Sequence, residues 1–153
     1  MKNRNKFFVW AFLVSFIFCS IAYGADQKES SRDYLSRLDK ALREVNIIYR
    51  NSAQKILPVS EGAKNMQVYI DNIKALTPPE SLTEQHKMIV QALEKLKNGF
   101  ELLVNGDRPG ALALIKTSSD LLKVATKAVL DFGKKEGLIK NDAKSVQKIG
   151  GIR

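Results

Sequence analysis

The sequence predicts an all-α fold, an antiparallel up-and-down bundle of about four helices followed by a short C-terminal helix. Apolar residues recur at alternating steps of three and four through three long segments, which is the spacing of helices that pack along their length. No segment alternates with the period of two that a half-buried strand requires. Short connections rich in proline or glycine separate the segments, and such connections join antiparallel neighbours.

Residues 1–24 predict a secretory signal peptide. A basic, acid-free start is followed by an uncharged apolar run from Phe7 to Tyr23, and Ala22 and Gly24 supply the small residues of a cleavage site. The alternative is an uncleaved anchor, because the 17 residues of this run are close to the minimum for a membrane span. In both cases the single domain at 25–153 lies outside the cytoplasm, so we expect a periplasmic or secreted bacterial protein.

The only cysteine, Cys19, and the only tryptophan both lie in this leader. Lipid attachment at Cys19 is disfavoured, because Phe18 precedes it where a lipoprotein site has a small residue. The exported part therefore has no disulfide, thiolate zinc site, iron–sulfur cluster or covalently attached haem. An apolar core has to hold it together.

The exported part is basic. Three of the 25 lysines and arginines lie in the leader, so 22 remain against 16 acids, a net charge of +6. The two signs are interspersed, which is typical of a solvated surface and allows weak contact with an anionic membrane surface. We expect no nucleic-acid partner, because an exported chain without interleaved aromatic residues lacks that pattern.

The first helical region is expected from Ser31 to Leu76. Ser30 or Ser31 can cap its start, and Asp33 lies in the first turn, where the helix dipole favours a negative charge. Its seam consists of Leu35, Leu38, Leu42, Val45, Tyr49, Ser52, Ile56, Val59, Ala63, Met66, Ile70 and Ile73.

Pro58 interrupts this seam without shifting its phase. Proline inside a helix lacks the N–H for an intrahelical bond and clashes with the preceding turn. A break at residues 57–61 gives helices that match the later ones in length, so the sequence favours a turn. A long helix kinked at Pro58 is the alternative.

The second helix follows the adjacent prolines of "LTPPES" and is expected to begin near Pro79–Leu82. Its seam consists of Leu82, His86, Ile89, Leu93, Leu96, Phe100 and Leu103. Asp107 can then cap a third helix, with Pro109 tolerated in its first turn. The seam of that helix consists of Ala111, Ile115, Ser118, Leu122, Ala125, Val129 and Phe132.

The third helix carries a wider apolar stripe than the others, so we expect it to be the most buried; the additional residues are Leu114, Leu121 and Ala128. A short helix is expected from about Asn141 to Ile149. Its row of lysines, which begins at Lys140 and includes Lys144 and Lys148, is interpreted as a solvated face.

His86 is the only histidine of the chain. A di-iron bundle needs Glu-x-x-His pairs on two helices, and the residue three before His86 is Thr83. Haem held between Met66 and His86 is disfavoured, because on consecutive antiparallel helices the two side chains would miss the same level by about 8 Å. We therefore expect neither a metal nor a cofactor, and we interpret both residues as packed seam positions.

Tyr49 lies on the first seam, and Tyr34 and Tyr69 flank it. Aromatic residues at helical spacing are typical of a core, with the hydroxyl groups reaching the edge of the bundle. The alternative is an aromatic-lined pocket for a small apolar ligand between the helices. The sequence favours core packing.

The sequence contains no nucleophile elbow, no glycine-rich phosphate loop and no marked carboxylate dyad, so we expect no catalytic residues and no enzyme. The favoured function is that of an exported, non-enzymatic bundle acting through another envelope or secreted protein or through the envelope surface. The alternative is an extracytoplasmic bundle that binds or senses a small ligand.

Overall fold

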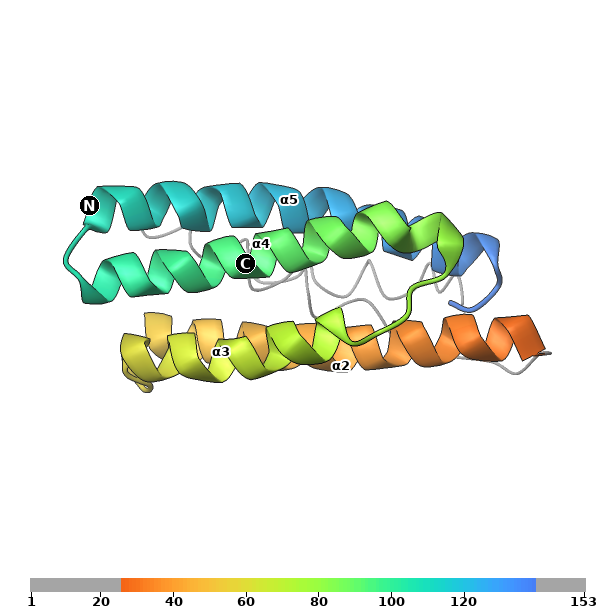
Figure 1. Ribbon diagram of the computed structural model, residues 1–153, viewed down its shortest axis with the longest axis horizontal. Coiled ribbons are helices and arrows are strands. Elements are labelled where there is room, and N and C mark those ends of the chain that lie inside the picture. Colours follow the sequence, from red (N-terminus) through yellow and green to blue (C-terminus); the bar gives the residue numbers. More distant parts are fainter. Residues whose placement is uncertain (1–25, 140–153) are drawn as a thin grey trace, which may run out of the picture.

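The computed structural model describes residues 26–139, which form four α-helices and one 3₁₀ helix. The elements are α2 (Asp26–Ala53), α3 (Val59–Lys74), η1 (Glu80–Leu82), α4 (Thr83–Val104) and α5 (Arg108–Lys135). Figure 1 shows the α-helices lying along one axis, each antiparallel to the next. The predicted all-α bundle is confirmed for this part of the chain. The leader at 1–24 and the short helix expected at Asn141–Ile149 lie outside the described residues.

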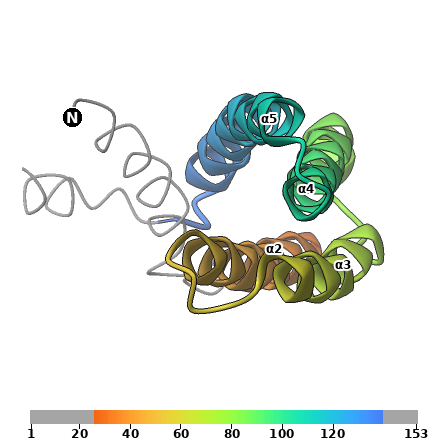
Figure 2. The same cartoon turned by 90° about the vertical axis from the view of Figure 1, so that its left-hand side faces the viewer.

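The α-helices are arranged in two layers, with α2 beside α3 and α4 beside α5 (Figure 2). The pair α4 and α5 makes the most extensive contact, followed by α3 with α4 and α2 with α3. Small residues explain the first observation. A Cβ atom added to Gly99 of α4 would lie 2.9 Å from a side-chain carbon of Ile115 and 3.2 Å from the carbonyl oxygen of Ala111, both on α5.

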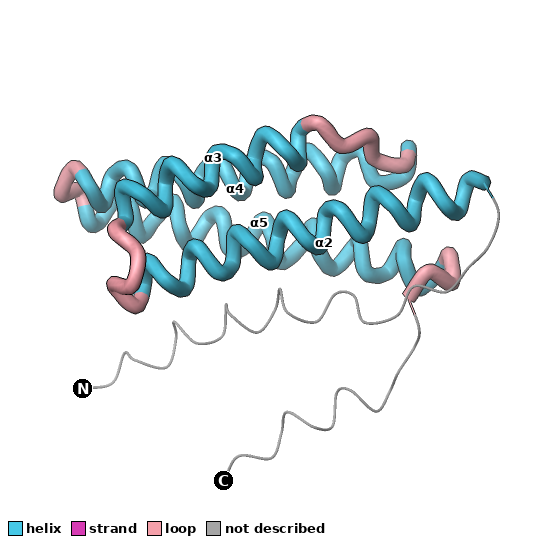
Figure 3. Tube along the Cα trace, turned by 90° about the horizontal axis from the view of Figure 1, so that it is seen from below, coloured by secondary structure: helices cyan, strands magenta, loops and turns pink. Residues whose placement is uncertain are grey.

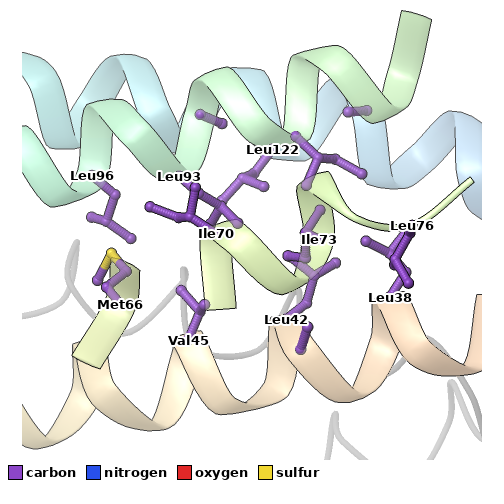
Figure 4. Close-up of a cluster of buried hydrophobic side chains, with 14 of the residues drawn as sticks. Leu38, Leu42, Val45, Met66, Ile70, Ile73, Leu76, Leu93, Leu96 and Leu122 are labelled. Atoms are coloured by element: carbon purple, nitrogen blue, oxygen red, sulfur yellow. The ribbon is translucent and has the colours of Figure 1, made fainter. Parts of the chain in front are cut away.

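The core runs the length of the bundle between the two layers and draws on all four α-helices. Figure 4 shows side chains from each helix converging there; those labelled are Leu38, Leu42, Val45, Met66, Ile70, Ile73, Leu76, Leu93, Leu96 and Leu122. Burial of this apolar surface is the main force that holds the helices together, at about 25 cal/mol per Å² removed from water.

The first helical region is broken by a turn, so the favoured prediction is confirmed. The helix α2 ends at Ala53, and α3 begins at Val59 with Pro58 at its N-cap. The seam prediction was wrong at Ile56, which is 69% exposed, and Val59 is only partly buried. The phase of three and four crosses a turn here, and a turn does not keep side chains on the face that a continuous helix would.

Two expected helix starts have different outcomes. The helix α2 begins at Asp26, earlier than the predicted cap at Ser30 or Ser31. The cap of α5 is confirmed, because Oδ1 of Asp107 accepts a hydrogen bond from the Gly110 amide at 3.0 Å. Among residues 26–139, no helix combines the length and hydropathy needed to cross a bilayer.

Three of the helices end in the same left-handed motif. The left-handed residues are Lys55 after α2, Gly106 after α4 and Gly137 after α5, with φ of 60°, 83° and 66°. Each next amide donates back into its helix, namely Ile56 to the Asn51 carbonyl at 2.8 Å, Asp107 to Leu102 at 2.9 Å and Leu138 to Gly133 at 2.8 Å. This is the Schellman arrangement, which usually has glycine at the left-handed position. Lysine there is unusual, because its Cβ crowds the following carbonyl.

Candidate functional site

The bundle has two distinct ends. The His86 end comprises the start of α2, the connection from α3 to α4 and the end of α5. The Ile56 end comprises the α2–α3 connection (residues 54–58) and the α4–α5 connection (residues 105–107). Figure 3 shows that these two connections lie together at one end, opposite the α3–α4 connection.

At the His86 end, a buried hydrogen bond links α2 to α4. His86 is 8% exposed, and its Nδ1 lies 3.1 Å from the hydroxyl oxygen of Tyr34. Burial lowers the pKa of His86 and raises the pKa of the Tyr34 hydroxyl, so both groups are neutral near pH 7. The histidine tautomer sets the direction of this bond, because a neutral imidazole has one donor and one acceptor nitrogen and the tyrosine hydroxyl can take either role. His86 thus has a structural partner that the sequence did not identify.

A surface pocket of about 670 Å³ opens at the same end. Its walls come from the start of α2, from the Pro79–Ser81 connection and from the end of α5, and they include Glu80, Phe132 and Glu136. His86 does not line it. The pocket therefore offers carboxylates and part of one aromatic ring, without the histidine as a base.

Met66 and His86 are not brought together. Gly62 of α3 faces Phe100 of α4, since a Cβ on Gly62 would lie 3.1 Å from that ring, and Figure 4 places Met66 beside Leu96. Leu96 is ten residues from His86, which corresponds to about 15 Å along α4. The separation is larger than the sequence indicated, and no haem between them fits. Within residues 26–139, no group of three or more potential metal-ligating His, Cys, Asp or Glu residues is found.

The two other tyrosines singled out from the sequence lie apart from both surface pockets. Tyr49 is buried and stacks on Phe100, with ring centroids 6.0 Å apart at 27°. Burial raises the pKa of Tyr49. Tyr69 is partly buried against the core. Both positions fit the core-packing interpretation.

Asp39 of α2 carries a buried carboxyl group. Its Oδ2 accepts from Arg43 Nε at 2.8 Å, whereas Oδ1 has no hydrogen-bond partner in the described part of the chain. Burial raises the pKa of Asp39, and the Arg43 guanidinium opposes this shift. One carboxyl group with one cation forms a local ion pair on α2, and no second acid joins it there.

The Ile56 end exposes apolar side chains. Ile56 is 69% exposed, Val104 at the end of α4 is 53% exposed, and Leu112 in the first turns of α5 is also exposed. A shallow groove of about 650 Å³ between α3 and α4 reaches this end; its walls include Ala63, Lys64, Lys97 and Val104. Sequence reasoning missed this region because it assigned Ile56 to the core.

The same end carries cations without a partner. Lys55, Lys64 and Arg108 are exposed and form no ion pair within residues 26–139. The acids nearby are engaged, because Glu101 pairs with Lys97 at 2.8 Å and Asp107 caps α5. The basic row predicted from Lys140 to Lys148 lies outside the described residues.

No family model, curated protein or solved structure gives a match to this chain, so the geometry of these two ends is what bears on its function.

Proposed function

We propose that this protein is an exported, non-enzymatic helical bundle that acts by contacting another envelope or secreted protein or the envelope surface. The observation that carries the proposal is the Ile56 end, where the exposed Ile56 follows Lys55, and where Lys64 and Arg108 are further exposed cations without an ion pair among the described residues. Val104 and Leu112 are further exposed apolar side chains at this end, and a contact there would remove their surface from water.

The arrangement of the polar residues supports a role without catalysis. The one histidine is buried and hydrogen-bonded to Tyr34, so its Nδ1 is not available as a base. A general base has to reach the proton that it removes, within hydrogen-bond distance or through one water. His86 lies instead inside the bundle, away from the walls of the larger pocket.

Photo-crosslinking in the cell tests the proposal. A photoreactive residue at Ile56 is expected to give discrete adducts in the envelope or medium, because this side chain faces outward. The matched control is Val68, which is also exposed but lies in the middle of α3. Equal adduct patterns at the two positions, or none at either, would argue against a contact site at the Ile56 end.

A second candidate function is the binding of a small ligand, which the 670 Å³ pocket at the His86 end favours because its size falls in the range of ligand sites. A ligand that binds only the folded state raises the melting temperature. Native mass spectrometry of the purified protein, followed by thermal denaturation with any co-purified molecule, distinguishes this candidate from the first.

A further inference from the structure

We propose that the Ile56 end docks on an anionic lipid surface. This inference rests on the proposed function and narrows it to one partner, a membrane whose headgroups carry negative charge. Ile56 and Val104 would reach the boundary between headgroups and acyl chains. Lys55, Lys64 and Arg108 would lie among the headgroups.

The exposure of Ile56 is not imposed by the backbone. In a Schellman cap the residue after the left-handed position commonly packs against the last turn of its helix. Leu138 follows Gly137 in this way and is 2% exposed. Ile56 occupies the equivalent place after Lys55, with the same 2.8 Å amide bond into its helix, yet it is 69% exposed. The same motif thus points an apolar side chain outward only at this end.

A second apolar side chain projects at the same end. Val104 is the last residue of α4, next to the connection that Figure 1 shows at the same end as the α2–α3 connection. A surface that covers this end of the bundle would meet both connections at once. Burial of apolar side chains in a bilayer is favourable, so two branched residues supply a modest anchor.

The charges complement an anionic interface. Three exposed cations come from three places, namely Lys55 in the α2–α3 connection, Lys64 in α3 and Arg108 at the start of α5. Three acids are also exposed at this end: Glu61 lies in the first turn of α3, Glu101 pairs with Lys97, and Asp107 caps α5. Each lysine or arginine near an anionic surface strengthens binding about fivefold.

These features favour a lipid surface over a protein partner. Protein hot spots are enriched in tryptophan and tyrosine in well-packed pockets. The Ile56 end instead presents separate aliphatic side chains on two connections, with lysine and arginine around them. Aliphatic residues flanked by cations are typical of segments that lie in a membrane interface.

Sedimentation with lipid vesicles tests the inference. The protein is produced from Ala25 onward, because the apolar leader would itself enter a bilayer. The shortened protein keeps every core residue of the described bundle, since these lie between Tyr34 and Leu138. Circular dichroism checks that it is helical. It is expected to sediment with vesicles of phosphatidylcholine and about one third phosphatidylglycerol, and not with phosphatidylcholine alone. The binding is expected to disappear as salt is raised from about 0.05 M to about 0.5 M, because salt screens exposed charges.

Matched variants locate the binding surface. The double change Ile56→Ser and Val104→Ser is expected to weaken binding about tenfold, and Lys55→Gln with Lys64→Gln by at least as much. The apolar control is Val68→Ser with Val124→Ser, which removes two equally exposed side chains from the middle of α3 and α5. The charge control is Lys40→Gln with Lys123→Gln, which removes the same charge from elsewhere.

A tryptophan probe tests insertion directly. Residues 25–153 contain no tryptophan, so Ile56→Trp creates a single fluorophore at the proposed contact. Its emission is expected to shift to shorter wavelengths with anionic vesicles, and the emission of a Val68→Trp control is expected to stay constant. No sedimentation with anionic vesicles, or equal losses in the test and control variants, would overturn the inference.

The outcome for the broader proposal is separate. If the protein does not sediment with anionic vesicles but crosslinking from position 56 in the cell yields a discrete protein adduct, the lipid inference is wrong and the contact function stands. If both fail, the Ile56 end is not a contact site.

Discussion

The helices α2 and α5 end in the same backbone motif, but Ile56 after α2 is 69% exposed whereas Leu138 after α5 is 2% exposed. The difference lies in what faces the apolar residue. The amide of Leu138 bonds to the Gly133 carbonyl, and the side chain of Ile139 fills the space that this glycine leaves, with Leu35 of α2 next to it. The amide of Ile56 bonds to the polar residue Asn51. A local motif therefore sets the backbone, and the neighbouring helices decide whether its apolar side chain closes the core.

The left-handed position differs as well. Glycine takes φ of 66° at Gly137 without a steric cost, whereas Lys55 takes φ of 60° with a Cβ in place. The end that closes the core thus has the favourable residue for its cap. The end that presents Ile56 retains a cation in a strained conformation, and strained residues are often found where a surface has a function.

The largest effect is expected from truncating the two apolar residues. Leu138→Ala should lower the free energy of unfolding by about 2–4 kcal/mol, because it empties a buried site. Ile56→Ala should change it by less than about 0.5 kcal/mol, because the side chain is exposed. Urea denaturation measures both. Similar losses in the two variants would mean that Ile56 packs in solution, and the contrast between the two ends would disappear.

A smaller loss is expected from Gly62→Ala, which tests how firmly the bundle is packed beneath Ile56. The added Cβ would lie 2.5 Å from Ser52 Oγ and 3.1 Å from the Phe100 ring, so the Ser52 side chain and the Phe100 ring have to shift to make room for it. Overpacking of this kind costs about 1–3 kcal/mol. The matched control is Ala63→Gly in urea denaturation, which opens space instead of filling it. An unchanged stability in Gly62→Ala would show that this end is loosely packed.

The fold was predictable from the sequence because its signals are local or periodic. The seam from Leu35 to Ser52 is buried as predicted, and so are Ala63, Met66 and Ile73. The exposure of Ile56 was not predictable. Its spacing of three and four continues that of the helix, although the residue lies in a turn. The left-handed conformation of Lys55 was not predictable either, because it is seen only in the backbone angle of the structure.

The relative burial of the helices was also predicted wrongly. Leu114, Leu121 and Ala128 widen the stripe of α5, but they are only partly buried, and α2 buries more of its residues than α5 does. The width of the apolar stripe on one helix does not reveal how closely the neighbouring helices approach it. The Tyr34–His86 bond escaped prediction for the same reason, since it joins residues 52 positions apart.

Exchanging the left-handed residues should produce opposite changes of about 1 kcal/mol. Lys55→Gly is expected to raise the free energy of unfolding, because glycine relieves the crowding at φ of 60°. Gly137→Lys is expected to lower it by a similar amount. Thermal and urea denaturation of the two single variants and of their combination measure the effect, and the double variant should resemble the original protein. Changes of the same sign would show that the two caps do not share one geometry.

The smallest effect is expected from pH, and it tests whether the His86 end is the closed one. Burial lowers the pKa of His86 below its ordinary 6.5 in the folded state, so between the two pKa values the unfolded chain binds more protons. The contribution of His86 to the free energy of unfolding is therefore constant above about pH 7 and falls as the pH decreases below about 6.5. Protonation makes Nδ1 a donor, so the Tyr34 hydroxyl then has to accept in this pair. The control variant His86→Gln keeps a hydrogen-bond acceptor and cannot titrate. The difference in the free energy of unfolding between the two proteins therefore isolates His86 from Asp39, whose raised pKa acts in the opposite direction at lower pH. Parallel pH profiles between pH 5 and pH 7 in urea denaturation would mean that water reaches His86, and that this end is as open as the other.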